Sequence, residues 1–151
     1  MSSAIAPVML ALLFATAVPA PTQDNPTSRV DLVQIQLNVP SKVTIGKAFI
    51  VMDEVENQGT TLAFQTVTGF YLSMDDVLDD SDVVVGARRV PQLGASQSHD
   101  NRTPITLKTE INPGDYYLLA VADAKHQIEE RTRANNVRAV RITVLPAEPK
   151  K

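Results

Sequence analysis

The sequence predicts an all-β domain, a seven-stranded immunoglobulin-like β-sandwich. Three observations lead to this fold class. Between residues 29 and 145, apolar residues recur at every second position far more often than at every third or fourth, which is the spacing of half-buried strands. Turn-forming residues interrupt the pattern about every ten residues, as they do in sandwich domains. No segment carries an apolar stripe of helical period long enough to compete with the strand pattern.

The predicted strands follow one another with short connections. The first strand, 31–39, alternates apolar and polar side chains and ends at Pro40-Ser41-Lys42. The second strand, 48–56, leads into Asn57-Gln58-Gly59, whose residue types favour a turn. The remaining five strands are predicted over residues 65–73, 83–90, 103–111, 115–123 and 137–144.

The entry to the sixth strand has a recognisable sequence. Asn112-Pro113-Gly114-Asp115 precedes two tyrosines, and in sandwich domains a tyrosine at this corner often bonds back to the upstream backbone. Alternation then places Tyr117, Leu119 and Val121 on the inward face. Because the chain has no Cys and no Trp, we expect its core to rest on aliphatic packing.

Asp53 interrupts the second strand. Strict alternation from Val51 to Val55 places this aspartate on the core face, where an unpaired carboxylate costs several kcal/mol. Two outcomes satisfy the pattern. A bulge near Met52 turns the carboxylate outward, or the carboxylate is buried and held by backbone donors or an arginine. The bulge needs no partner, and it is the predicted outcome.

The basic residues predict no nucleic-acid partner. The chain has 14 basic and 17 acidic residues and a net charge of −3, whereas phosphate binding requires an excess of clustered Lys and Arg. Arg88-Arg89 is interpreted as the solvent face of an edge strand, where charge discourages pairing with another sheet. The same solvent-face interpretation applies to the arginines around the last loop and strand, which are Arg131, Arg133, Arg138 and Arg141.

The amino-terminal part predicts export. The first 23 residues carry no charged side chain, and Ala4 to Val18 form an almost continuous apolar run. Such a run is typical of a signal peptide and is short for a spanning helix. The sequence therefore divides into a signal peptide over 1–20, a linker over 21–28, a domain over 29–145 and a charged tail over 146–151. We expect a secreted, periplasmic or cell-surface protein without a permanent membrane anchor.

Catalytic patterns are scarce in this chain. With no Cys there is no thiolate metal site and no cysteine nucleophile. The two histidines, His99 and His126, fall in predicted loops, and adjacency in Ser98-His99-Asp100 does not make a triad, because a triad needs side chains that converge from separate segments. The sequence predicts no enzyme and no catalytic residue, and an unrecognised hydrolase is the least favoured alternative.

Four motifs, taken in order, resemble a known family. The central motif runs from Phe70 to Asp82 and is closed by Gly86. The others are Asp31-Leu32-Val33, Asn57-Gln58-Gly59, and Pro113 to Asp123 leading to Asn135-Asn136. Together they resemble the bacterial cell-adhesion-related domain, CARDB, over residues 31–144. The resemblance implies an immunoglobulin-like module of exported and cell-surface prokaryotic proteins with adhesion or interaction roles. Arg133 departs from the pattern, which places an acidic residue there.

The acidic loop is the part of the sequence that comes nearest to a chemical site. Asp75, Asp79 and Asp82 match acidic positions of the CARDB pattern, and their spacing would place them on one side of a helical turn. Ca²⁺ would offset the repulsion of three such carboxylates. The alternative is structural, with Ser73 and Asp75 capping a turn while the other carboxylates are solvated. Calcium is thus the candidate cofactor, with these three residues as its candidate ligands.

These features predict a non-catalytic binding or interaction module whose partner is a protein or glycan of the cell envelope. An alternative function is that of an accessory protein that stabilises a partner by pairing with it along a strand edge. A long, uncharged strand edge would favour strand pairing, whereas polar loops would favour ligand binding.

Overall fold

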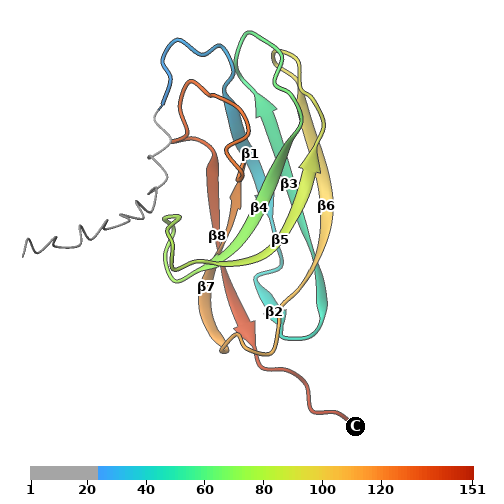
Figure 1. The fold of residues 1–151 in the computed structure, drawn as a ribbon. Helices are drawn as coiled ribbons and strands as arrows, with labels where there is room; N and C mark the ends of the chain where they lie inside the picture. Colours follow the sequence, from blue (N-terminus) through green and yellow to red (C-terminus); the bar gives the residue numbers. More distant parts are fainter. Residues whose placement is uncertain (1–23) are drawn as a thin grey trace, which may run out of the picture.

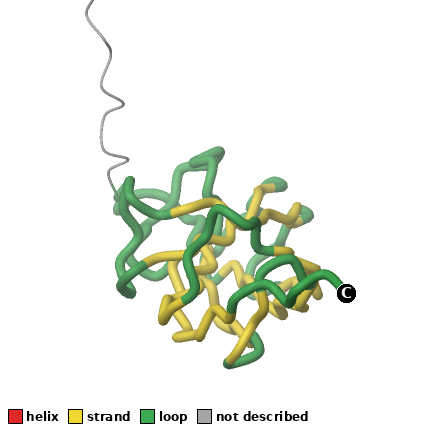
Figure 2. Tube along the Cα trace, turned by 90° about the horizontal axis from the view of Figure 1, so that it is seen from below, coloured by secondary structure: helices red, strands yellow, loops and turns green. Residues whose placement is uncertain are grey.

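Figure 1 shows a computed structural model of the chain, which describes residues 24–151 as two β-sheets packed face to face. The predicted signal peptide, residues 1–20, lies outside the described residues. Strands and loops account for all of residues 24–151, as Figure 2 shows. In this part of the chain no helix is long and apolar enough to cross a membrane. The all-β sandwich predicted from the alternating pattern is confirmed.

The two sheets contain three and five strands. The smaller sheet has the order β1-β3-β6, and the larger has the order β2-β8-β7-β4-β5. All neighbouring strands are antiparallel except β2 and β8, which are parallel. The strand bounds are β1 Leu32–Asn38, β2 Lys42–Thr44, β3 Ala48–Asn57, β4 Thr66–Ser73, β5 Val83–Val90, β6 Ser98–Thr106, β7 Gly114–Val121 and β8 Val137–Leu145.

Two of these strands differ from the prediction. The segment around Lys42 was predicted as a turn that ends the first strand. It forms the short strand β2, which pairs with the end of β8 and brings the number of strands to eight. The strand predicted over 103–111 runs instead from Ser98 to Thr106 and pairs with β3 along its whole length. Its first residues are polar because β6 is an edge strand, with side chains largely exposed. Polar edge strands lack the apolar alternation by which strands are detected.

A buried ion pair crosses the core at Asp53, and the predicted bulge near Met52 is absent. Arg88 Nε and Nη2 each lie 2.7 Å from a carboxylate oxygen of Asp53, and Gln34 Nε2 donates to Oδ2 at 2.9 Å. The bulge in this sheet falls on β1, at Ile35. The solvent-face interpretation of Arg88 is therefore wrong, because the charge of Asp53 draws its guanidinium inward.

This ion pair lies on the same face of β3 as two apolar clusters. Val51 belongs to the larger cluster, which also includes Phe70 and Leu118, and Val55 belongs to the smaller one with Leu32. Asp53 lies between these two valines in the alternation of β3. The core is therefore apolar at both ends and ionic between them.

The inward face of β7 is displaced by one residue from the prediction. Tyr116, Leu118 and Ala120 pack in or against the larger cluster, whereas Tyr117 is half-buried and lies opposite Ser73 and Arg141. The Tyr116 hydroxyl donates to Asn112 O at 2.9 Å, closing the predicted tyrosine corner. Leu119 and Val121 are also buried but belong to neither cluster. The predicted corner is present, and Tyr116 forms it.

Candidate functional site

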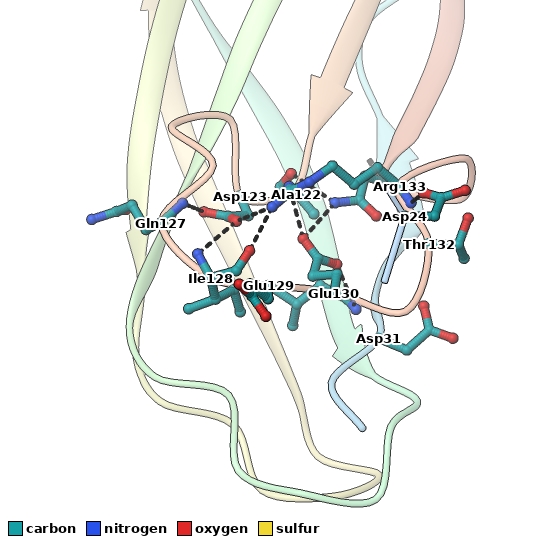
Figure 3. Close-up of polar contacts among 12 residues, drawn as sticks. Asp24, Asp31, Ala122, Asp123, Gln127, Ile128, Glu129, Glu130, Thr132 and Arg133 are labelled. Atoms are coloured by element: carbon teal, nitrogen blue, oxygen red, sulfur yellow. Dashed lines mark hydrogen bonds and ion pairs between the residues drawn. The ribbon is translucent and has the colours of Figure 1, made fainter. Parts of the chain in front are cut away.

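The loop between β7 and β8, residues 122–136, carries a dense polar network in the described chain. We call it the anchor loop. Figure 3 shows its centre, where the Arg133 side chain runs between the carboxylates of Asp123 and Glu130. Both carboxylate side chains are 0% exposed, and the Arg133 side chain is 15% exposed. The anchor loop therefore buries two carboxyl groups and one guanidinium together.

Asp123 shapes the first turn of the anchor loop. Its carboxylate accepts hydrogen bonds from the backbone N–H of Gln127 at 2.9 Å and Ile128 at 3.2 Å, which is the usual way for Asp to close a local turn. The backbone φ of Asp123 is 45°, in the left-handed region that Asp tolerates better than most residues. Arg133 Nη2 then reaches the same carboxylate at 3.1 Å.

Glu130 is held from three directions. Its oxygens accept from Leu32 N at 3.0 Å, Asn136 Nδ2 at 2.9 Å and Arg133 Nη1 at 3.0 Å. Burial raises the pKa of Glu130 to about 7, although the hydrogen bonds from Asn136 and Leu32 and the charge of Arg133 lower it. The negative charge of Asp123 adds to the upward shift of this pKa. The single guanidinium thus does not fully offset two buried carboxylates.

Arg133 is an internal ion-pair partner, and its predicted place on the solvent face is wrong. Arg133 also departs from the family pattern, which places an acidic residue there. The signal that could have found its role is the presence of Glu130 three residues earlier and Asp123 at the end of β7. Arg141 is exposed, as its alternation predicted. It lies 3.4 Å from Asp115 on the neighbouring strand.

His126 lies close to this network. Its φ of 50° places it in the left-handed region, in a turn closed by its own N–H bonding to Asp123 O at 2.9 Å. Burial lowers the pKa of His126, and the charge of Arg133 lowers it further, while Asp123 opposes both. This histidine therefore favours the neutral form more than a free one does.

The anchor loop fastens the segment through which the chain enters the domain. We call residues 24–31 the entry segment, which includes most of the predicted linker. Asn25 N donates to Glu130 O at 3.0 Å, and Arg131 N donates to Val30 O at 2.8 Å. Arg133 N reaches Asp24 Oδ1 at 2.8 Å, and Asn135 Nδ2 reaches Asp31 Oδ1 at 2.8 Å. These bonds give residues 24–28 of the predicted linker a defined path along the domain.

The predicted turn after β3 holds the other side of the entry segment. The Asn57 side chain is buried and accepts from Gly59 N while donating to Thr61 O and Leu93 O. Thr60 N donates to Arg29 O at 2.7 Å. A Cβ on Gly59 would lie 2.0 Å from Arg29 O, so only glycine permits this approach.

The acidic loop, residues 74–82, places its three predicted calcium ligands in local turns. Asp75 Oδ1 accepts from Val77 N at 2.9 Å, and Asp79 Oδ1 accepts from the N–H and hydroxyl of Ser81. The hydrogen bonds from Ser81 lower the pKa of Asp79. Asp82 Oδ2 accepts from Asp79 N, so Asp79 and Asp82 are neighbours while Asp75 closes a turn of its own.

This arrangement does not gather a metal-binding set. Within residues 24–151, no three His, Cys, Asp or Glu side chains come together as a metal ion would require. The predicted helical turn is absent, because these aspartates bond to nearby backbone N–H groups. The alternative in which Ser73 caps a turn is present, since Ser73 Oγ accepts from Asp75 N at 3.2 Å. As arranged here, Asp75, Asp79 and Asp82 do not fit a shared calcium ion.

Ser98, His99 and Asp100, which do not make a triad by adjacency in sequence, lie on strand β6 and not in the predicted loop. Ser98 Oγ donates to Glu54 at 2.6 Å, and Arg88 Nη1 lies 3.1 Å from His99 Nδ1. Because Arg88 is always a donor, His99 Nδ1 accepts this bond. Ser98 and His99 therefore have separate partners and do not form a nucleophile and its base.

Four exposed apolar side chains lie between the end of β4 and the start of β5. Met74 is 75% exposed, Val77 62%, Val83 51% and Val84 62%, and we call these four residues the hairpin patch. Figure 1 shows the loop between β4 and β5 projecting away from the sandwich. Beside β5 lies a groove of about 240 Å³, lined by apolar residues including Val83, Val84 and Ile111 and by Lys108 and Glu110.

The CARDB family model matches residues 29–140, which is most of the described chain. The chain belongs to the CARDB family. The motifs of this CARDB domain now have structural reasons, since Asn57 and Gly59 fix the entry segment, and Asn135 and Asn136 hold Asp31 and Glu130.

Solved CARDB structures share its fold. A CARDB domain of Pyrococcus furiosus, determined in complex with di-metal ions, is 20% identical, with a TM-score of 0.59 over 79% of this chain and 96% of that chain. A domain described as part of a cell surface protein of Methanosarcina acetivorans is 19% identical, with a TM-score of 0.57 over 78% and 94%. At these identities the likeness shows the fold.

The same fold occurs as a small part of larger enzymes. β-Glucosidase 3B of Thermotoga neapolitana is 15% identical to this chain, with a TM-score of 0.53. The match covers 77% of this chain but 16% of the glucosidase. Among proteins with curated descriptions, none matches this chain.

Proposed function

We propose that this CARDB protein is an exported, non-catalytic interaction module that contacts an envelope partner through the hairpin patch. The observation that carries the proposal is the exposure of Met74, Val77, Val83 and Val84 along the β4–β5 hairpin, whose loop projects from the sandwich. Apolar side chains gathered in this way are unusual on a soluble surface and are typical of protein interfaces. Their chemistry favours a protein partner over a glycan.

The polar loops support this choice of surface. The carboxylates of Asp123 and Glu130 form ion pairs inside the domain. Those of Asp75 and Asp79 accept hydrogen bonds from the backbone of their own loop. Groups that are already satisfied inside a domain contribute little to recognition of a ligand. The hairpin patch, by contrast, gains free energy when a partner removes it from water.

Export of the protein is supported by sequence and by likeness. The apolar run from Ala4 to Val18 has the length and the lack of charge of a signal peptide. A neighbour of similar fold is described as part of a cell surface protein. Both observations favour a secreted, periplasmic or cell-surface location.

Strand pairing at the edge of β5 is the second candidate function. In the described chain β5 pairs with β4 alone, and its first residues, Val83 to Ala87, carry no charge. Such an edge can accept an extended partner segment. A register shift, however, leaves Val85 without a partner on β4, and bulges of this kind interrupt an edge. We therefore favour docking through side chains over strand pairing.

Calcium binding by Asp75, Asp79 and Asp82 stays a prediction. The di-metal complex of the Pyrococcus furiosus domain motivates a test of metal binding in this protein as well. The local turns of the acidic loop argue against a shared ion there. The variant Asp79→Asn tests the loop directly, because a calcium-dependent rise in melting temperature that this variant abolishes would establish it as a site.

A capture experiment with matched variants tests the proposed function. The purified protein is immobilised and exposed to envelope extract from the source organism, and the retained proteins are compared with those retained by Met74→Ser/Val77→Ser. The control is Phe64→Ser, because Phe64 is 68% exposed outside the hairpin patch. Loss of one retained protein in the hairpin variant but not in the control supports the proposal. Equal retention by all three proteins contradicts it.

A further inference from the structure

Three oxygen atoms of the anchor loop surround the Arg133 guanidinium. Asp123 Oδ2 lies 3.1 Å from Nη2, and Glu130 Oε1 lies 3.0 Å from Nη1. The carbonyl oxygen of Ile128 also accepts from Nη2, at 2.5 Å. Two carboxylates and a main-chain carbonyl around a positive centre are the ligand types that hard cations take in proteins.

The charges at this site favour a divalent ion. Asp123 and Glu130 contribute two buried carboxyl groups, each negative when ionised, whereas Arg133 contributes one positive charge. An ion of charge +2 would balance both carboxylates, which a guanidinium does not. Oxygen ligands in an irregular arrangement suit calcium better than zinc or magnesium, because calcium accepts variable geometry and higher coordination.

A buried oxygen without a partner lies next to the same carboxylate. Asn136 is 2% exposed and donates through Nδ2 to Glu130 Oε1 and Ala122 O. Its side-chain oxygen, Oδ1, has no hydrogen-bond partner among the described residues. Buried acceptors are rarely left unpaired. The Nδ2 of this amide contacts the same Glu130 oxygen that Arg133 binds, so Asn136 lies beside the site.

We propose that Arg133 serves as a built-in cation in an oxygen-lined site of the anchor loop, and that this site binds calcium once the arginine side chain is removed. In the natural protein the guanidinium keeps the anchor loop folded without metal. The anchor loop in turn fixes the entry segment, since Asn25, Val30 and Asp24 all bond to residues 130–133. Arg133 therefore sets the path of the entry segment into the domain without help from an ion.

Substitution of Arg133 by serine tests the proposal, because serine empties the site and leaves its oxygens in place. Thermal melting of the whole protein and of Arg133→Ser is measured with calcium chloride and with a chelator, and calcium affinity is measured by calorimetry. Arg131→Ser is the matched control, since Arg131 is exposed and reaches the entry segment through its backbone N–H. The double variant Arg133→Ser/Glu130→Gln removes one charged ligand.

The proposal expects calcium to act on Arg133→Ser alone. At calcium a hundredfold above the dissociation constant, the folded-to-unfolded ratio of this variant rises roughly a hundredfold relative to chelator. For the natural protein and for Arg131→Ser, the melting curves with calcium and with chelator superimpose. The double variant binds calcium at least about tenfold more weakly than Arg133→Ser does. If Arg133→Ser is unfolded in chelator, its refolding on addition of calcium supports the proposal equally.

Other results overturn it. These are an absence of calcium response in Arg133→Ser, a response of the same size in the natural protein, or a calcium affinity that is unchanged in the double variant. A variant that stays unfolded with and without calcium also overturns the proposal.

Discussion

Arg88 on β5 and Asp53 on β3 form a two-point ion pair, with both N–O distances at 2.7 Å, that joins the two sheets through the core. The side chains are 3% and 0% exposed. The pair connects the edge strand of the five-stranded sheet to the central strand of the three-stranded sheet. It therefore fixes the position of the strand that carries Val83 and Val84 of the hairpin patch.

Breaking this pair should be costly. We expect Arg88→Met to lower the free energy of unfolding by roughly 3–5 kcal/mol, because it leaves the Asp53 carboxylate buried without its cation. The double variant Asp53→Leu/Arg88→Met should recover most of this loss, since no buried charge remains at this position. Urea denaturation of the three proteins measures both effects. A double variant no more stable than Arg88→Met would show that the charge itself is not the cause.

The two tyrosines of β7 should differ sharply. We expect Tyr116→Ala to cost at least about 2 kcal/mol, because its ring packs against the larger core cluster. Tyr116→Phe should cost about 1 kcal/mol through the lost bond to Asn112 O. Tyr117→Ala should stay below about 1 kcal/mol, because this residue is half-buried outside the cluster. Chemical denaturation ranks the variants, and a larger loss at Tyr117 than at Tyr116 would refute the assigned inward face.

The sandwich and the order of most strands along the chain could be predicted from the sequence, because most strands have one buried and one exposed face. That signal is weak where an edge strand is polar on both faces, which explains the displaced β6. The inward face of β7 was displaced by one residue because Leu118 and Leu119 are both fully buried and Tyr116 and Tyr117 both intermediate, so alternation does not distinguish the faces.

The candidate site was harder to predict than the fold. Glu130 and Arg133 look like surface residues in sequence, since charged side chains are mostly exposed, and the alternation that places Asp53 on the core face does not identify its partner. Their burial depends on partners brought together by the fold, with Asp53 and Arg88 separated by 35 residues. The hairpin patch is visible in sequence only as Met74 and Val77 within an acidic loop.

Glu130 should make the stability of the protein depend on pH. Its pKa is raised from 4.5 to about 7 on folding, so the folded state binds a proton more readily than the unfolded state. Stability from this group is therefore present below pH 4.5 and is lost as the pH rises toward about 7. His126, whose pKa is lowered, acts in the opposite direction, losing stability as the pH falls below 6.5.

The variant Glu130→Gln isolates this contribution. We expect the natural protein to lose roughly 2–3 kcal/mol relative to Glu130→Gln between pH 5 and pH 8, because only the natural side chain ionises. Urea denaturation at the two pH values gives the difference, and His126 cancels because it is present in both proteins. A constant difference between the two proteins across this range would mean that Glu130 has an ordinary pKa.

Residues 1–25 should direct export. Fused to a reporter enzyme that is active only outside the cytoplasm, they should give activity, because the apolar run from Ala4 to Val18 has the composition of a signal peptide. The control fusion carries arginine in place of both Leu12 and Leu13, which interrupts the run. Equal reporter activity from both fusions, or none from either, would contradict the prediction.

The proposed interaction surface is tested most directly by photo-crosslinking in intact cells. A photoreactive amino acid is placed at Val77 in one version of the protein and at Phe64 in another, and both versions are irradiated in the organism that makes the protein. Both positions are exposed to a similar degree, 62% and 68%. The hairpin patch predicts a discrete crosslinked species of higher mass from position 77 and none from position 64. The same species from both positions, or from position 64 alone, would contradict it.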